Sequence, residues 1–258
     1  MQVPKYAAIL AAMCLSLDAY AANDAHFIPD CAGTVAVAHA RVARVTDDGT
    51  LILADGRRLR LEGIHLPLAD KEMSGRAVAA LRAMTMDGLL NFTTVTPDKD
   101  RYGRMRVQGF GTLWLQAALL EQGWARVRIA PDRSECAPDL YEAEARARAR
   151  HAGIWAKEHY RVRSPEKLKD TIGTFQLVEG LVSNIGRADG RTFIDFSDPK
   201  DNRRVFTAVI GSESRRAFRD FEFDELSGHR VRLRGVVQDY RGRPEIALSN
   251  PAQIEVLN

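Results

Sequence analysis

The sequence is poor in cysteine and aromatic residues and has no long apolar run beyond its first residues. It contains three cysteines in 258 residues, and aromatic residues make up 7%. So few aromatic residues argue against extensive base stacking, and the lack of a later long apolar run argues against a membrane span. The formal net charge is +3, but from Gly173 onward basic and acidic residues are equal in number. The positive surplus therefore lies in the N-terminal part, which favours a local anion site over a broad basic surface.

The first 21 residues have the pattern of a secretory signal. Lys5 precedes an apolar run over residues 7–17, and Ala19 and Ala21 stand where a signal peptidase recognises small residues. We therefore expect cleavage after Ala21 and export to the periplasm or the extracellular space. The alternative, a short buried helix, is disfavoured because the apolar run is short.

Removal of the signal takes away Cys14 and leaves Cys31 and Cys136. In an oxidising compartment two cysteines can pair in only one way. We expect a disulfide that ties the extended N-terminus to the loop before a helix. A closed loop near one hundred residues stabilises a protein by roughly 4–5 kcal/mol in the chain-entropy model. Two free thiols are the alternative.

The chain divides at a charged segment that contains proline and little apolar periodicity. We assign residues 22–160 to a first domain, residues 161–172 to a linker and residues 173–258 to a second domain. Nothing in the sequence identifies a protein partner or an oligomeric state.

The first domain alternates strand and helix patterns. Hairpin signals at Asp47-Asp48-Gly49 and Asp55-Gly56 separate the first apolar stretches, and Ser74 is the expected N-cap of the first helix. The expected strands cover residues 35–45, 50–53, 58–64, 90–95, 105–110 and 124–129, and the expected helices 74–87, 114–122 and 139–151. This order predicts a mainly β fold with helices (α+β), built on a five-stranded OB-type barrel.

The second domain predicts another small OB-like barrel. Its expected strands cover residues 180–185, 191–196, 204–210, 229–240 and 245–248, with a helix over 214–221. The hairpin around residues 234–244 resembles that of small OB modules that bind nucleic acid. A shared fold does not establish shared binding, so a packing or protein-contact role is the alternative.

Two short runs in the first domain carry arginines in a recognisable setting. They are Leu59-Arg60-Leu61-Glu62-Gly63-Ile64-His65-Leu66-Pro67 and Asp100-Arg101-Tyr102-Gly103-Arg104. With Leu119-Leu120-Glu121-Gln122-Gly123-Trp124-Ala125 and Gly153-Ile154-Trp155, they resemble the thermonuclease (staphylococcal-nuclease-like) family of phosphodiesterases over about residues 35–155.

The resemblance implies that Arg60 and Arg104 grip one phosphate of a substrate. An arginine suits that role because its planar guanidinium donates two hydrogen bonds to phosphate oxygens and stays charged. The alternative is that Arg60 covers a sheet face and Arg104 pairs with Asp100. Tyr102 is expected to pack in its turn or to stack on a sugar or base.

The family's metal ligands and base are replaced in this sequence. Gly49 and His65 stand where the family has calcium-binding carboxylates, and Leu68 stands where it has the glutamate that activates water. Asp47 or Asp48 could enter the first place by a one-residue slip, and an aspartate with His65 would suit a softer transition metal. Asp70 and Glu72 are candidates to replace the base, with solvated loop charges as the alternative.

Three functions follow as hypotheses. The first is an exported protein that binds nucleic acid or nucleotide phosphates in an arginine pocket, with calcium-dependent hydrolysis lost or altered. The second is an active secreted phosphodiesterase or endonuclease that uses a divalent cation at a rebuilt site. The third is a non-catalytic envelope interaction module whose arginines are structural.

Overall fold

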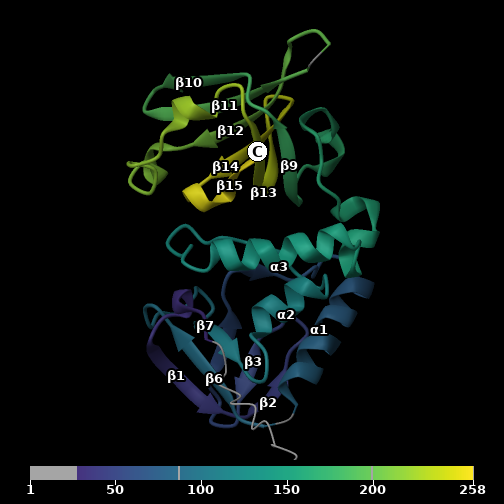
Figure 1. Ribbon diagram of the computed structural model, residues 1–258, viewed down its shortest axis with the longest axis vertical. Coiled ribbons are helices and arrows are strands. Elements are labelled where there is room, and N and C mark those ends of the chain that lie inside the picture. Colours follow the sequence, from purple (N-terminus) through teal and green to yellow (C-terminus); the bar gives the residue numbers. More distant parts are fainter. Residues whose placement is uncertain (1–27, 87, 199, 258) are drawn as a thin grey trace, which may run out of the picture.

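The computed structural model describes residues 28–86, 88–198 and 200–257 and shows two β-rich domains (Figure 1). The predicted signal segment lies outside these residues. Helix α3 (Ala137–Ala149) runs between the two sheet systems. The predicted mainly β fold with helices is confirmed. No helix in the described part of the chain is long and apolar enough to cross a membrane.

The first domain is a barrel whose sheet has the strand order β1-β6-β7-β4-β3-β2. The two end strands, β1 and β2, follow each other directly in the chain. Together they act as one bent strand that pairs with β6 at one end and with β3 at the other, and this closes the barrel. β4 and β7 are parallel and the other neighbours are antiparallel, which is the connectivity of a five-stranded OB-type barrel. The strands are β1 (Val35–Ala40), β2 (Val42–Val45), β3 (Leu51–Leu53), β4 (Arg58–Leu61), β6 (Leu90–Thr94) and β7 (Met105–Phe110).

Three helices cover this barrel, and a short pair of strands joins it to them. They are α1 (Lys71–Thr85), α2 (Leu115–Glu121) and α3, with β5 (Ile64–His65) paired to β8 (Arg126–Val127). The expected start of α1 at Ser74 is wrong. The helix begins earlier because the Asp70 carboxylate accepts a hydrogen bond from the Met73 amide and so caps the first turn.

The second domain repeats the connectivity of the first. Its sheet has the order β10-β11-β12-β14-β13-β15, and β9 pairs with β13 and runs on toward β10. β12 and β14 are parallel, as β4 and β7 are in the first barrel. The strands are β9 (Phe175–Leu181), β10 (Asn184–Ala188), β11 (Arg191–Ser197), β12 (Arg204–Ile210), β13 (Arg230–Tyr240), β14 (Arg243–Leu248) and β15 (Ile254–Leu257).

The helix expected over residues 214–221 is wrong. The segment between β12 and β13 contains 3-10 turns at Ser212–Ser214 and Phe223–Leu226 instead. Phe218, Phe221 and Phe223 pack on one another with ring centroids 4.9–5.8 Å apart, and Phe218 is buried in the barrel core. Aromatic packing at this uneven spacing replaces the regular i, i+3, i+4 stripe that a helix would bury.

The segment predicted as a linker lies against the second barrel. Arg163 forms a backbone bridge to Val178, and Leu168 and Thr171 are buried. Two 3-10 turns, Pro165–Lys167 and Lys169–Thr171, cover half of the segment.

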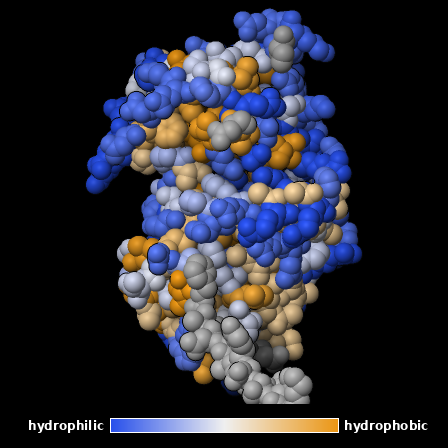
Figure 2. All heavy atoms as spheres, viewed as in Figure 1, coloured by the Kyte–Doolittle hydropathy of each residue, from blue (hydrophilic) through white to orange (hydrophobic). Residues whose placement is uncertain are grey.

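The two domains meet across a buried polar and apolar interface. A cluster with Trp155, Tyr160 and Leu177 at its centre joins the end of the first domain to β9. Beside it, the Arg234 guanidinium pairs with Glu144 of α3 at 3.1 Å, and both side chains are almost fully buried. Hydrophilic residues cover much of the surface at the level of α3 on the face shown in Figure 2. The pair of Arg234 with Glu144 therefore links the second barrel directly to α3.

Candidate phosphate site of the first domain

The turn Asp100–Arg104 positions the second arginine. The Asp100 carboxylate accepts hydrogen bonds from the amides of Tyr102 and Arg104, at 2.9 and 3.0 Å. Gly103 has φ +75°, a conformation that glycine adopts without strain. The turn therefore holds the Arg104 side chain at the start of β7, beside the parallel strand β4 that carries Arg60.

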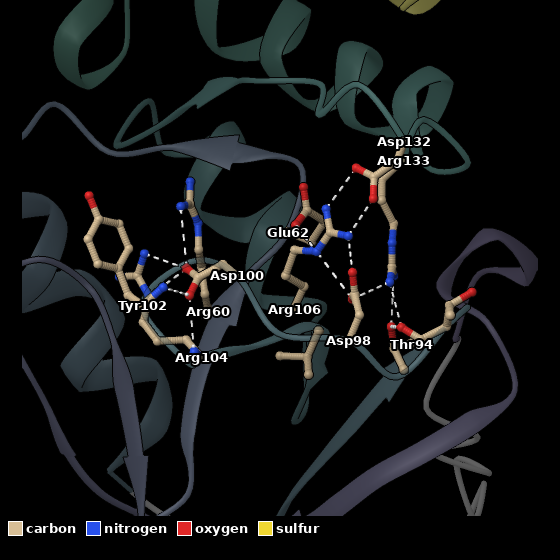
Figure 3. A network of polar contacts seen from close by, with 12 residues as sticks. Arg60, Glu62, Thr94, Asp98, Asp100, Tyr102, Arg104, Arg106, Asp132 and Arg133 are labelled. Carbon is tan, nitrogen blue, oxygen red and sulfur yellow. Dashed lines mark hydrogen bonds and ion pairs between the residues drawn. The ribbon is translucent and has the colours of Figure 1, made fainter. Parts of the chain in front are cut away.

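Arg104 is held by several partners, whereas Arg60 is less constrained. The Nε and Nη2 atoms of Arg104 contact Asp100, and its Nη1 donates to Asp48 and Thr50, both at 3.0 Å. The nearest carboxylate oxygen to Arg60 belongs to Asp100 and lies 3.8 Å away. Figure 3 shows Asp100 between these arginines, with Tyr102 alongside. Burial alone would raise the pKa of Asp100, but hydrogen bonds from Arg104 and the turn amides hold it below its usual value.

A cavity of about 440 Å³ opens between these elements. Four arginines line it, against a single acidic residue among the lining side chains. The lining comprises Asp48, Gly49, Arg58, Arg60, Leu61, Ile64, His65, Leu66, Leu68, Leu81, Tyr102, Arg104 and Arg128. Such a surplus of positive charge favours an anion over a divalent cation.

An apolar contact fills the place of the family's first metal ligand. Gly49 has φ +77°, and a Cβ atom built on it would lie 2.4 Å from the Leu66 Cδ1 atom. Leu66 belongs to the buried core, while the side chain of Leu68 lines the cavity. A carboxylate at position 49 would therefore require both a strained backbone and displacement of Leu66.

Each of the candidate metal ligands contacts another side chain. Asp47 pairs with Arg82 at 2.8 Å, and Asp48 pairs with Arg104. His65 packs its ring against Phe175, with 5.5 Å between centroids. Among the described residues, no group of three or more histidine, cysteine, aspartate or glutamate side chains is placed to hold a metal ion.

His65 is a neutral side chain in a cationic setting. Burial, together with the nearby charges of Arg126, Arg128 and Arg60, lowers its pKa to about 4. An uncharged imidazole at neutral pH adds nothing to the positive charge of the cavity.

The titration of His65 predicts a loss of stability in mild acid. Because its folded pKa lies below the unfolded value of about 6.5, the unfolded chain binds the proton first as the pH falls. The free energy of unfolding is expected to drop by on the order of 2 kcal/mol between pH 7 and pH 5 from this group. Urea denaturation of His65→Gln beside the unmodified protein isolates the effect, and an imidazole that titrates near its ordinary pKa in NMR would contradict it.

The candidates for a replacement base are held elsewhere. Asp70 caps α1, and the Lys157 ammonium contacts Asp70 at 3.2 Å and Glu72 at 3.0 Å. These carboxylates thus join α1 to the end of the first domain.

Sequence reasoning missed Glu62, Arg106 and Arg128. Arg106 pairs with Asp98 and Asp132 and lies 3.9 Å from Glu62 (Figure 3). Burial raises the pKa of Glu62, although Arg106 opposes that shift. The only signal in the sequence was the spacing Arg60-Leu61-Glu62, which places both side chains on one face of a strand. The pairing of Arg60 with Arg106 across the parallel strands is visible only in the structure.

A five-stranded barrel that presents two arginines to one cavity, with a tight Asp-x-Tyr-Gly-Arg turn, defines a staphylococcal-nuclease-like domain. Residues 58–157 match the family described as staphylococcal nuclease homologue, so this part of the first domain is similar to that family. The matched range includes Arg60, Tyr102 and Arg104 and ends before the second barrel. No curated protein matches the chain. This similarity suggests a nuclease-like or nucleic-acid-binding function.

Proposed function

We propose that the first domain binds a phosphate group of a nucleic acid or nucleotide between Arg60 and Arg104, and that calcium-dependent hydrolysis has been lost. The composition of one cavity carries this proposal. Four arginines line it, while Gly49, His65 and Leu68 occupy the places of the family's metal ligands and base. Leucine and glycine side chains can neither bind calcium nor accept a proton from water.

The two arginines have different parts in this binding. Asp100, Asp48 and Thr50 fix the Arg104 guanidinium, so little conformational entropy is lost when an anion reaches its remaining Nη2 hydrogen. Arg60, about one third exposed and farther from Asp100, is free to turn its fork toward a phosphate. The fixed arginine orients the site and the freer one supplies most of the contact.

Replacement of Arg60 by alanine is expected to weaken the binding of single-stranded DNA or RNA by about 10- to 100-fold, because a charge-assisted hydrogen bond is worth about 1.5–3 kcal/mol. Fluorescence anisotropy in the presence of chelator measures the affinity. Arg57→Ala is the matched control, since Arg57 lies on the same hairpin but pairs with Asp55 outside the cavity.

A cleavage assay on the same samples separates the three hypotheses. Cleavage that needs calcium, manganese or zinc and disappears in Arg60→Ala would overturn the loss of hydrolysis. Equal binding by Arg60→Ala and Arg57→Ala, or no binding by any form, would leave the arginines a structural role.

We also propose that the protein acts after export. The Ala19-Tyr20-Ala21 pattern supports signal cleavage, and the pairing of Cys31 with Cys136 suits an oxidising compartment.

A further inference from the structure

A second cavity, of about 510 Å³, lies between the two barrels and joins the arginine cavity. Both cavities are lined by Arg60, Ile64, Tyr102 and Arg128. The first domain adds Glu62, Arg101 and Ile129 to the second cavity, and the opposite wall comes from β13 and β14. The space around the arginines is therefore not a closed phosphate pocket but one end of a longer cleft.

The junction of the two cavities carries positive charge that the protein does not neutralise. Arg128 is exposed there, and its guanidinium makes no ion pair or hydrogen bond within the part of the chain that the structure describes. Arg101 lies over the Tyr102 ring, 4.8 Å from its centroid. By contrast, the Arg106 guanidinium donates four hydrogen bonds to Asp98 and Asp132. The free cations thus mark the path from the first cavity into the second.

The wall from the second barrel combines apolar and amide groups. Val236 and Gln238 are exposed on β13, and Ala247 and Ser249 belong to the adjacent lining. A wall of this mixed character suits a sugar and base better than a second phosphate.

The position of this wall is fixed. The buried pairing of Arg234 with Glu144 anchors β13, and the Asn250 amide donates to the Pro131 carbonyl at 3.2 Å. Gln253 donates to the Arg234 carbonyl at 3.0 Å. A cleft held open by such contacts needs no rearrangement before a ligand enters.

We propose that the second barrel forms one wall of a subsite for the adjoining nucleotide of a single-stranded nucleic acid. This rests on the proposed phosphate binding by the first domain. A phosphate at Arg60 and Arg104 would be followed along the strand by a sugar and base against Val236 and Gln238, with Arg128 and Arg101 beside the connecting backbone. A cavity of this volume holds a nucleotide unit and is far too small for a duplex.

The test measures the affinity of the full chain for fluorescent oligothymidylates of two to twelve nucleotides, and for thymidine 5′-monophosphate by competition. The variant Val236→Glu places a negative charge on the exposed wall. Val256→Glu is the matched control, because Val256 is exposed on the neighbouring strand β15 and does not line the cleft. Gln238→Glu, nearly isosteric, repeats the test without a change of volume.

We expect Val236→Glu and Gln238→Glu to weaken the binding of an octamer by about 5- to 10-fold at low salt and that of the mononucleotide by less than about 2-fold. Affinity should rise from the monomer to short oligomers and then level off. Equal octamer affinity in Val236→Glu and Val256→Glu, with mononucleotide binding intact, would overturn the subsite alone. Absence of mononucleotide binding in the unmodified protein would overturn the proposed phosphate site, on which the subsite proposal rests.

Discussion

Replacement of Glu144 by glutamine is expected to lower the free energy of unfolding by about 3–5 kcal/mol, because it leaves a buried arginine without its main counter-charge. Glu144 is fully buried and accepts hydrogen bonds from the Val127 amide and from Arg234. Arg234 is itself 1% exposed and stacks over Tyr141 at 4.0 Å. Its other carboxylate partner, Glu255, belongs to the same barrel and cannot replace a contact between domains.

Urea denaturation followed by circular dichroism measures this loss. Glu142→Gln is the control on the same helix, since that side chain is 77% exposed in its pair with Arg146. An exposed pair contributes about 0–1 kcal/mol, so Glu142→Gln should leave the midpoint almost unchanged. If the two variants unfold at the same urea concentration, the buried pair is not what couples the barrels.

A calorimetric scan adds a second readout. Loss of the pair is expected to turn one unfolding transition into two, as the barrels cease to support each other. The double variant Glu144→Leu, Arg234→Met should recover much of the stability, because a buried ion pair is often replaced by apolar residues at little cost.

The sequence could not have predicted this interface. In β13 the apolar residues Val231 and Leu233 alternate with Arg230, Arg232 and Arg234, a pattern that indicates one buried face and one solvated face. That interpretation suits an isolated barrel. Docking of the first domain covers part of the polar face, and only three-dimensional placement brings Arg234 to Glu144, 90 positions away in the chain.

The candidate site was more predictable, because its residues lie in short local patterns. The turn that holds Arg104 follows from Asp100 and Gly103, and Arg60 was predicted from the run Leu59–Pro67 that resembles the nuclease family. The parts that escaped prediction are those set by contacts between distant segments. Arg128 reaches the cavity from after β8, and Asp70 caps a helix rather than facing solvent from a loop.

Reduction of the disulfide is the second change expected to have a large effect. Cys31 and Cys136 are bonded across 105 positions, and a loop of that length contributes about 4–5 kcal/mol in the chain-entropy model. Cys136 is the N-cap of α3, and Cys31 lies in the 3-10 turn before β1. The bond therefore ties the first barrel to the helix that carries Glu144.

Denaturation of one sample with and without reductant measures this contribution without a change of sequence. The midpoint in urea is expected to fall on reduction. In protein recovered after export, the mass after alkylation without reduction should match the chain from Ala22 with no label, because the proposed cleavage would remove Cys14. Labelling of both thiols would contradict the bond. An unchanged urea midpoint on reduction would contradict its contribution to stability.

The disulfide is also expected to affect ligand binding, because it lies beside charged residues that line the cleft. Cys31 and Cys136 line a small cavity together with Glu62, Arg106 and Arg133, so the disulfide lies directly behind the ion network at the floor of the cleft. Loss of the bond is therefore expected to loosen that floor as well as to destabilise the fold. Octamer binding by the reduced protein should weaken more than mononucleotide binding, because only the longer ligand extends from the arginine cavity into the cleft between the barrels.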